Sequence, residues 1–120
     1  FFKHVNDTYG HGFGDIVLVE FARLLTKHVK NKGIAVRFGG EEFMLVLKGM
    51  NTDEIGKMLE HIRREYKEYT KHEKNIECSF SSGVQHYTEG IAVTVLYRLA
   101  DEKLYTAKER GRNQDVFDLE

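Results

Sequence analysis

Three segments of the chain repeat apolar residues every three or four positions, the spacing of one face of an α-helix. In the first segment, after Asp15, the apolar residues are Leu18, Phe21, Ala22, Leu25 and Val29. The second contains Ile55, Met58, Leu59, Ile62, Tyr66 and Tyr69, and the third contains Val95 or Leu96, Leu99, Ala100, Leu104 and Ala107. Each pattern predicts a helix that packs its apolar face on a core.

Residues at the ends of these segments suit helix termini. Asp15 could cap the first helix, and Asn51 could cap the second. Asp53 and Glu54 would then lie in the first turn of the second helix, where negative charge suits the helix dipole. Gly111 follows the third pattern and predicts its end.

Shorter apolar runs predict strands. Residues 34–36 and 43–47 flank the sequence Phe38-Gly39-Gly40-Glu41, which predicts a β-hairpin with a glycine turn. Apolar and polar residues alternate over 76–80, as in a half-buried strand, and 84–87 either continues that strand or pairs beside it. Val116 and Phe117 predict a short last strand. This order of helices and strands predicts an α+β layered fold.

Composition narrows the class of protein. The chain has 120 residues, enough for one domain, with 41% hydrophobic and 31% charged residues, as in a globular protein. It contains no apolar run near the roughly 20 residues that span a bilayer. A net charge of −1 argues against a nucleic-acid-binding surface. The lone Cys78 cannot form an intrachain disulfide and fits a reducing cytoplasm.

The tip of the predicted hairpin carries the strongest candidate chemistry. Gly39 and Gly40 allow a tight turn and a close approach to a ligand. Glu41 and Glu42 follow at once, and neighbouring side chains of an extended strand diverge, so we expect different roles for them. One could hold a hard cation such as Mg²⁺, which prefers carboxylate oxygen. Considered alone, these residues favour a solvated turn, and only the other segments change that interpretation.

Two further segments are dense in polar residues. Residues 3–15, rich in polar and glycine residues, lie between an apolar start and the first helix. At the other end, Lys108 falls in the last turn of the third helix and Arg112 just beyond it. These cations either favour the helix C-terminus or bind phosphate.

Together these three segments resemble the GGDEF family, the catalytic domains of diguanylate cyclases. The family pattern contains Phe-Lys-x-x-Asn-Asp-x-x-Gly-His-x-x-Gly-Asp, then Gly-Gly-(Asp/Glu)-Glu-Phe, then Ala-Asp-x-x-(Leu/Met)-Tyr-x-Ala-Lys-x-x-Gly-(Arg/Lys)-Asn. This chain is similar from Phe2 to Asn113. The resemblance implies one domain over residues 1–120, with a palm-like nucleotidyl cyclase fold. Its ferredoxin-like core would be an antiparallel-rich central sheet flanked by helices.

The resemblance also implies site residues. Glu41 would be a catalytic metal ligand, and Glu42 would be catalytic beside the metal and the phosphates. Asn6 and Asp15 would bind the guanine. Backbone at Gly39 and Gly40 would pass close to the nucleotide. The phosphates would be bound by Lys3, Lys108 and Arg112.

The implied activity is condensation of two GTP molecules into cyclic di-GMP with release of two pyrophosphates. It implies Mg²⁺, with Mn²⁺ as a substitute, and a homodimer with one GTP on each domain. An upstream sensory or regulatory domain would control it. The domain would be cytoplasmic, including as the cytoplasmic part of a membrane-anchored protein, without touching membrane or nucleic acid. The alternative is an inactive GGDEF domain that serves as a GTP-binding or protein-interaction module.

The chain departs from the family pattern in two places. The family's Asp-x-Asp would end before Phe1, so we expect the first central strand and a metal carboxylate to be missing, and this chain alone to be inactive. We expect other residues or a second copy to fill the slot beside 43–47, because unpaired strand edges recruit strands. The final Leu119-Glu120 matches a cloning scar or belongs to the native chain. The family's inhibitory Arg-x-x-Asp is replaced by Lys30 and Gly33, so we expect that product site to be lost.

Overall fold

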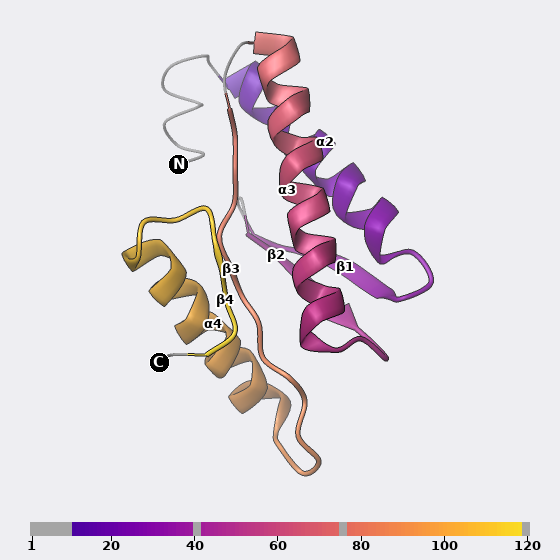
Figure 1. Cartoon of the computed structure of the whole chain (residues 1–120), viewed down its shortest axis with the longest axis vertical. Coiled ribbons are helices and arrows are strands. Elements are labelled where there is room, and N and C mark those ends of the chain that lie inside the picture. Colours follow the sequence, from indigo (N-terminus) through magenta and orange to yellow (C-terminus); the bar gives the residue numbers. More distant parts are fainter. Residues whose placement is uncertain (1–10, 40–41, 75–76, 119–120) are drawn as a thin grey trace. The chain divides into compact units, whose positions relative to one another are not determined.

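The computed structural model describes residues 11–39, 42–74 and 77–118. The chain divides into two compact units, Phe1–Cys78 and Ser79–Glu120. The first unit contains α2 (His11–Val29), β1 (Gly33–Gly39), β2 (Glu42–Leu47) and α3 (Thr52–Lys74), and the second contains β3 (Ser82–Gly83), α4 (Val93–Glu109) and β4 (Asp115–Val116) (Figure 1). The fold is α+β, as the sequence predicts.

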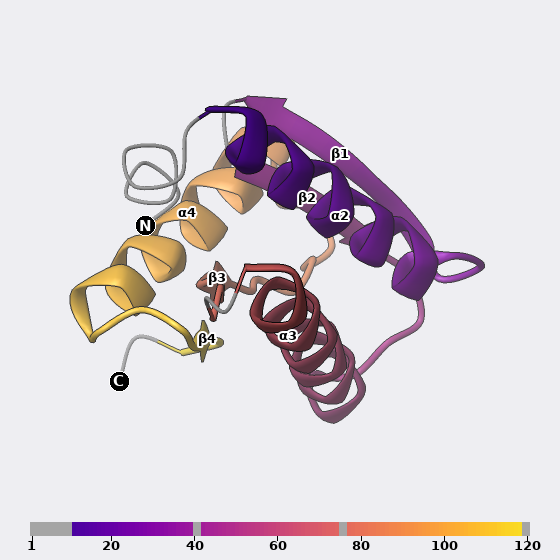
Figure 2. The same ribbon diagram turned by 90° about the horizontal axis from the view of Figure 1, so that it is seen from above.

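The core of the first unit is formed by the apolar faces of α2 and α3. Its buried side chains are Val17, Leu18, Leu24, Leu25 and Val29 from α2, and Ile55, Met58, Leu59, Ile62 and Tyr66 from α3. The Phe21 ring on α2 lies with its centroid 4.8 Å from that of Tyr66 and 5.3 Å from that of Phe43 on β2. Figure 2 shows α2 lying across the β1–β2 hairpin. Both predicted helices are therefore confirmed, together with their buried faces.

The two helix starts turn out differently. At the start of α3, the Glu54 backbone N–H donates to Asn51 Oδ1 at 2.9 Å, and the Asn51 N–H donates to Glu54 Oε1 at 3.0 Å. This reciprocal capping box confirms the predicted cap. The prediction that Asp15 caps the first helix is wrong, because α2 begins four residues earlier, at His11. Its apolar periodicity starts only later, so the pattern did not reveal the first turn.

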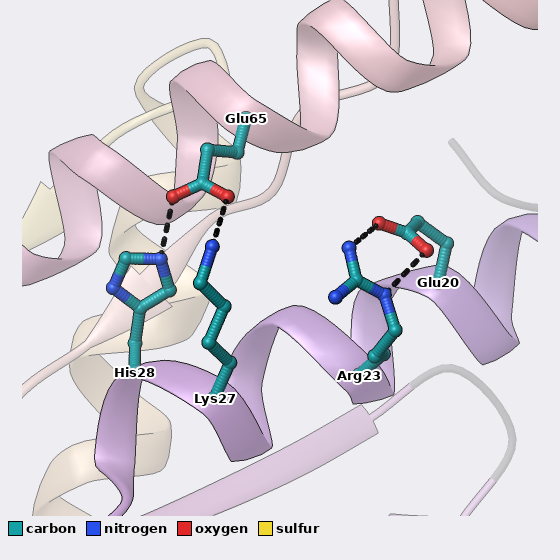
Figure 3. A network of polar contacts seen from close by, with 5 residues as sticks. All are labelled: Glu20, Arg23, Lys27, His28 and Glu65. Carbon is teal, nitrogen blue, oxygen red and sulfur yellow. Dashed lines mark hydrogen bonds and ion pairs between the residues drawn. The ribbon is translucent and has the colours of Figure 1, made fainter.

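A polar network joins α2 to α3 on the outside of this core (Figure 3). The Glu65 carboxylate on α3 accepts from Lys27 Nζ at 3.1 Å, and its other oxygen lies 2.7 Å from His28 Nε2. Burial pushes the Glu65 pKa up, but the hydrogen bonds from Lys27 and His28 outweigh it, so this pKa lies below its ordinary value. Arg23 instead binds Glu20 within α2, through two hydrogen bonds of 2.9 and 2.6 Å.

The predicted hairpin is confirmed. Strands β1 and β2 pair antiparallel, with Ile34 opposite Val46 and Val36 opposite Met44. The register shifts between Arg37 and Gly39, which marks a β-bulge just before the tip. Among the described residues, β2 pairs only with β1, so the expected occupant of its other edge stays a prediction.

The second unit is built around α4. Strands β3 and β4 pair in parallel, Ser82 with Asp115 and Gly83 with Val116, and both contact α4. The third predicted helix is thus confirmed, and the predicted last strand lies one residue earlier than expected. The strand expected over 76–80 is not found in 77–80, because a strand needs a ladder partner and none of the described residues supplies one there. The pairing begins only at Ser82.

Gly83 allows β3 to approach α4 closely. A Cβ built on Gly83 would lie 2.2 Å from both the Ala100 carbonyl oxygen and the Leu104 nitrogen. No side chain fits at such distances from a helix backbone, so the contact requires glycine. None of the helices within the described residues is long and apolar enough to cross a membrane.

Candidate functional site

The first group of predicted site residues lies at the hairpin tip. Gly39 ends β1, Glu42 begins β2, and the register makes these two residues direct partners. No described atom lies within 4 Å of where a Gly39 Cβ would be, so the backbone there is accessible. The Glu42 side chain is exposed and has no described hydrogen-bond or ion-pair partner. Gly40 and Glu41, which complete the predicted tip, lie outside the described residues.

The second group lies at the C-terminal end of α4. The Arg112 N–H donates to the Ala107 carbonyl at 2.9 Å, and the Gly111 N–H lies 3.4 Å from the Lys108 carbonyl. With Gly111 at a φ of 111°, these two bonds form a Schellman motif, which ends the helix at the predicted glycine. The chain therefore reverses directly after Lys108 and returns Arg112 to the same helix end.

Two further residues extend the left-handed turn. Arg112 has a φ of 63° and Asn113 a φ of 51°, and neither is glycine. Side chains with a Cβ adopt this region at a cost, and such residues persist only where surrounding bonds hold them. Because Arg112 is one of the predicted phosphate ligands, this strain lies at a predicted site residue.

Lys108 and Arg112 form a pair of exposed cations. The Arg112 guanidinium folds back over the last turn, with Nη1 3.5 Å from the Lys108 carbonyl oxygen. Within the described part of the chain, neither cation has a carboxylate partner. Like charges four residues apart repel each other, while the helix dipole favours cations at this end. An ammonium and a guanidinium at one place can bind a phosphate chain, the guanidinium with two parallel hydrogen bonds.

The remaining predicted ligands are not described. Lys3 and Asn6 lie outside the described residues, as do Gly40 and Glu41, and Asp15 is placed only as part of the α2 backbone. The structure brings Gly39 to Glu42 in the first unit and Lys108 to Arg112 in the second. Each pair is described within its own unit.

The chemistry of the hairpin tip fits a magnesium ion. Mg²⁺ takes oxygen ligands and is bound in proteins by one or two carboxylates together with water and substrate phosphate. Glu42 offers such a carboxylate, with no partner among the described residues, and Glu41 is its neighbour in sequence. No group of three or more acidic, histidine or cysteine residues that could hold a metal occurs in the described residues.

The position of the family's inhibitory aspartate cannot hold a side chain in this backbone. A Cβ at Gly33 would lie 1.8 Å from the Val46 carbonyl oxygen and 3.0 Å from the Leu47 Cα. Gly33 pairs with Leu47 at the open end of the hairpin, and Lys30 lies exposed just beyond the end of α2. Glycine thus serves the strand pairing itself, and the expected loss of the product site stays a prediction.

The sequence patterns did not reveal the residues that hold the Arg112 turn. Ser81 and Gln114 form hydrogen bonds with the backbone of this turn, and Gly83 allows α4 to approach β3 closely. Ser81 and Gln114 are common surface residue types and give no signal by themselves. An isolated glycine next to a strand does signal a close backbone approach, so Gly83 could have been found.

The described residues form an α+β fold that carries a glycine-carboxylate hairpin in the first unit and a cationic helix end in the second. A family model described as "Diguanylate cyclase, GGDEF domain" matches residues 1–114. The chain therefore belongs to the GGDEF family, as its three motifs indicate.

Known diguanylate cyclases and GGDEF domains are similar to this chain in sequence and in structure. Diguanylate cyclase A of Treponema denticola is 39% identical over 118 residues, covering 95% of this chain and 32% of that protein. The active GGEEF domain of a diguanylate cyclase from Vibrio cholerae matches with a TM-score of 0.84 and 33% identity, over 96% of this chain and 74% of that one. The GGDEF domain of DgcB from Caulobacter crescentus, solved with cyclic di-GMP, has a TM-score of 0.82 and 30% identity, over 96% and 70%. The chain spans about a third of the length of the curated relatives it matches.

Proposed function

We propose that this domain, within its full-length protein, condenses two GTP molecules into cyclic di-GMP. The observation that carries the proposal is the Lys108–Arg112 cation pair, two exposed charges without described carboxylate partners at one helix end. A triphosphate supplies the negative charge that such a pair lacks. Membership of the GGDEF family and the retained Glu41-Glu42 pair support the same reading.

In this proposal the chain's own residues bind and orient the nucleotide. Asn6 and Asp15 hold the guanine, whose N–H groups suit a carboxylate acceptor. Lys3, Lys108 and Arg112 hold the phosphates and offset the charge that develops on them during transfer. Gly39 and Gly40 admit the nucleotide close to the backbone. Glu41 would hold Mg²⁺, or Mn²⁺ in its place, and Glu42 would lie beside the metal and the phosphates. The ion, when bound, polarises a phosphate and favours deprotonation of the attacking hydroxyl.

The reaction requires two domains, each with one GTP. The 3′-oxygen of one GTP attacks the α-phosphorus of the other, its bond to the β-phosphate oxygen breaks, and pyrophosphate leaves; the second half of the reaction is the same with the roles exchanged. Each attacking hydroxyl loses one proton. We therefore propose a catalytic homodimer in the cytoplasm, where GTP is present, under the control of a regulatory domain elsewhere in the protein.

The test is turnover by the full-length protein with GTP and Mg²⁺, with products separated by chromatography and identified by mass. We expect one cyclic di-GMP and two pyrophosphates for every two GTP consumed. If GTP binds but no product forms at any protein concentration or with Mn²⁺, the domain is a binding module instead. If GTP does not bind at all, both readings are wrong.

A further inference from the structure

The turn that carries Arg112 is held by a side chain outside the predicted motifs. The amide of Gln114 donates one hydrogen bond to the Arg110 carbonyl at 3.1 Å and one to the Arg112 carbonyl at 3.2 Å. Both acceptors are carbonyl oxygens, so only the NH₂ end of the amide can serve them, and both of its donors are used. Gln114 thus spans the left-handed residues on one side.

The other side of the turn is held by the neighbouring strand. The Asn113 N–H donates to Ser81 Oγ at 3.2 Å, and the Ser82 N–H donates to the Gln114 carbonyl at 3.0 Å. Ser82 Oγ further donates to Asp115 Oδ1 at 2.8 Å. The turn is therefore bonded to α4 by its Schellman bonds, to Ser81 just before β3 and to Ser82 in β3, and across itself by Gln114.

The hydrogen bonds described above hold an exposed turn in a strained backbone conformation. Arg112 and Asn113 hold φ values of 63° and 51°, which cost free energy, and the turn is solvent-exposed, so it buries no apolar core in return. A shorter or relaxed loop could equally end the helix. In this geometry the Arg112 guanidinium lies back over the last turn of α4, with Nη1 3.5 Å from the Lys108 backbone carbonyl oxygen.

We propose that Gln114 is a positioning residue for Arg112: it pre-orders the turn so that the guanidinium is held ready for a nucleotide triphosphate. This rests on the proposed role of Arg112 in phosphate binding. A pre-ordered side chain loses less conformational entropy on binding, so the same contacts give a higher affinity. Ser81 supports the same geometry from the strand.

The test is a double-mutant cycle in the full-length protein. Gln114→Met keeps the shape of the side chain and removes both donors, and Arg112→Ala removes the guanidinium. Affinity for a non-hydrolysable GTP analogue is measured by calorimetry for the wild type, both single variants and the double variant, and thermal unfolding is recorded for each. Gln85→Met is the matched control, because the Gln85 amide also makes two bonds in the second unit, to the His86 carbonyl and from Lys103 Nζ, and neither partner belongs to the turn.

Gln114→Met should weaken binding about tenfold, from the loss of two hydrogen bonds that order the turn. In the Arg112→Ala background the same substitution should have no further effect, whereas a purely structural role would give the same effect in both backgrounds. Gln85→Met should bind like the wild type. If Gln114→Met fails to fold, Ser81→Ala replaces it in the cycle, with a smaller loss of affinity expected.

The outcomes separate the two claims. If Arg112→Ala binds the analogue as tightly as the wild type, the phosphate role of Arg112 fails, and the positioning role fails with it. If Arg112→Ala weakens binding but Gln114→Met does not, or weakens it equally in both backgrounds, the positioning role alone is wrong.

Discussion

His28 Nε2 on α2 lies 2.7 Å from Glu65 Oε1 on α3, and this contact joins two helices that are distant in sequence (Figure 3). Lys27 binds the other oxygen of the same carboxylate at 3.1 Å. A single carboxylate thus connects the last turn of α2 to the middle of α3, on the surface of their apolar contact.

The lowered Glu65 pKa predicts a pH dependence of stability. A carboxyl whose pKa is lowered on folding stabilises the protein above its unfolded pKa of 4.5, and this contribution is lost as pH falls through the folded pKa. About a third of the Glu65 side chain is exposed, at 36%, so solvent screening keeps the effect below about 1 kcal/mol. Glu65→Gln should lower the melting temperature at pH 7, and the difference from wild type should shrink below pH 4.5.

The control for this prediction is Glu20→Gln. Glu20 forms its hydrogen bonds to Arg23 within α2, so Glu20→Gln removes a carboxylate without removing a hydrogen bond between α2 and α3. Its difference from wild type therefore reports the loss of a carboxylate apart from the α2–α3 bonds. A Glu65→Gln protein whose difference from wild type stays unchanged from pH 7 down through the folded pKa, below pH 4.5, would show that the carboxylate charge is irrelevant to the helix contact.

Gly83→Ala should destabilise the second unit. The added Cβ would lie 2.2 Å from the α4 backbone at Ala100 and Leu104, so strand and helix must separate, at a cost of about 3 kcal/mol. Gly90→Ala is the comparison: no atom lies within 4 Å of its Cβ, and only its φ of 88° opposes the change, at about 1 kcal/mol. Chemical denaturation of both variants measures the two costs. Equal costs would mean that backbone conformation, and not contact with α4, explains both.

Glu41→Gln should abolish cyclic di-GMP synthesis by the full-length protein while leaving its fold intact. An amide has one neutral oxygen where the carboxylate has two charged ones, so it is a poor ligand for a hard cation. Circular dichroism checks the fold and product chromatography checks the activity. A correctly folded Glu41→Gln protein that still turns over GTP would remove Glu41 from the metal site.

Cyclic di-GMP should not bind tightly at the surface around Lys30. Gly33 supplies no carboxylate, and the strand pairing leaves no room for one, because a Cβ there would meet the Val46 carbonyl at 1.8 Å. Calorimetry with cyclic di-GMP should therefore detect no sub-micromolar site that depends on Lys30. Tight binding that disappears in Lys30→Ala would show that this surface recognises the product without the aspartate.

The helices and their ends could be predicted from the sequence alone, because the residues that specify them lie close together in the chain. The apolar positions of Leu25 and Ile62 predicted buried helix faces, because burial repeats with the helix period. The segment Asn51-Thr52-Asp53-Glu54 predicted the start of α3, because cap signals lie within one turn of the chain. Gly111 predicted the end of α4 for the same reason: the left-handed residue and the bonds it permits lie close together in the chain. The three motifs, read together, also indicated the family.

Only the tertiary structure decided features that depend on distant partners. Residues 77–80 have the alternation of a strand but no ladder, and the ladder between Ser82 and Asp115 joins residues that are remote in sequence. The motif around Arg112 predicted a phosphate-binding role for it. It did not predict the hydrogen bonds by which Gln114 holds the backbone of that turn. Alternation and composition report which face a residue prefers, and they carry no information about which backbone group a side chain will meet.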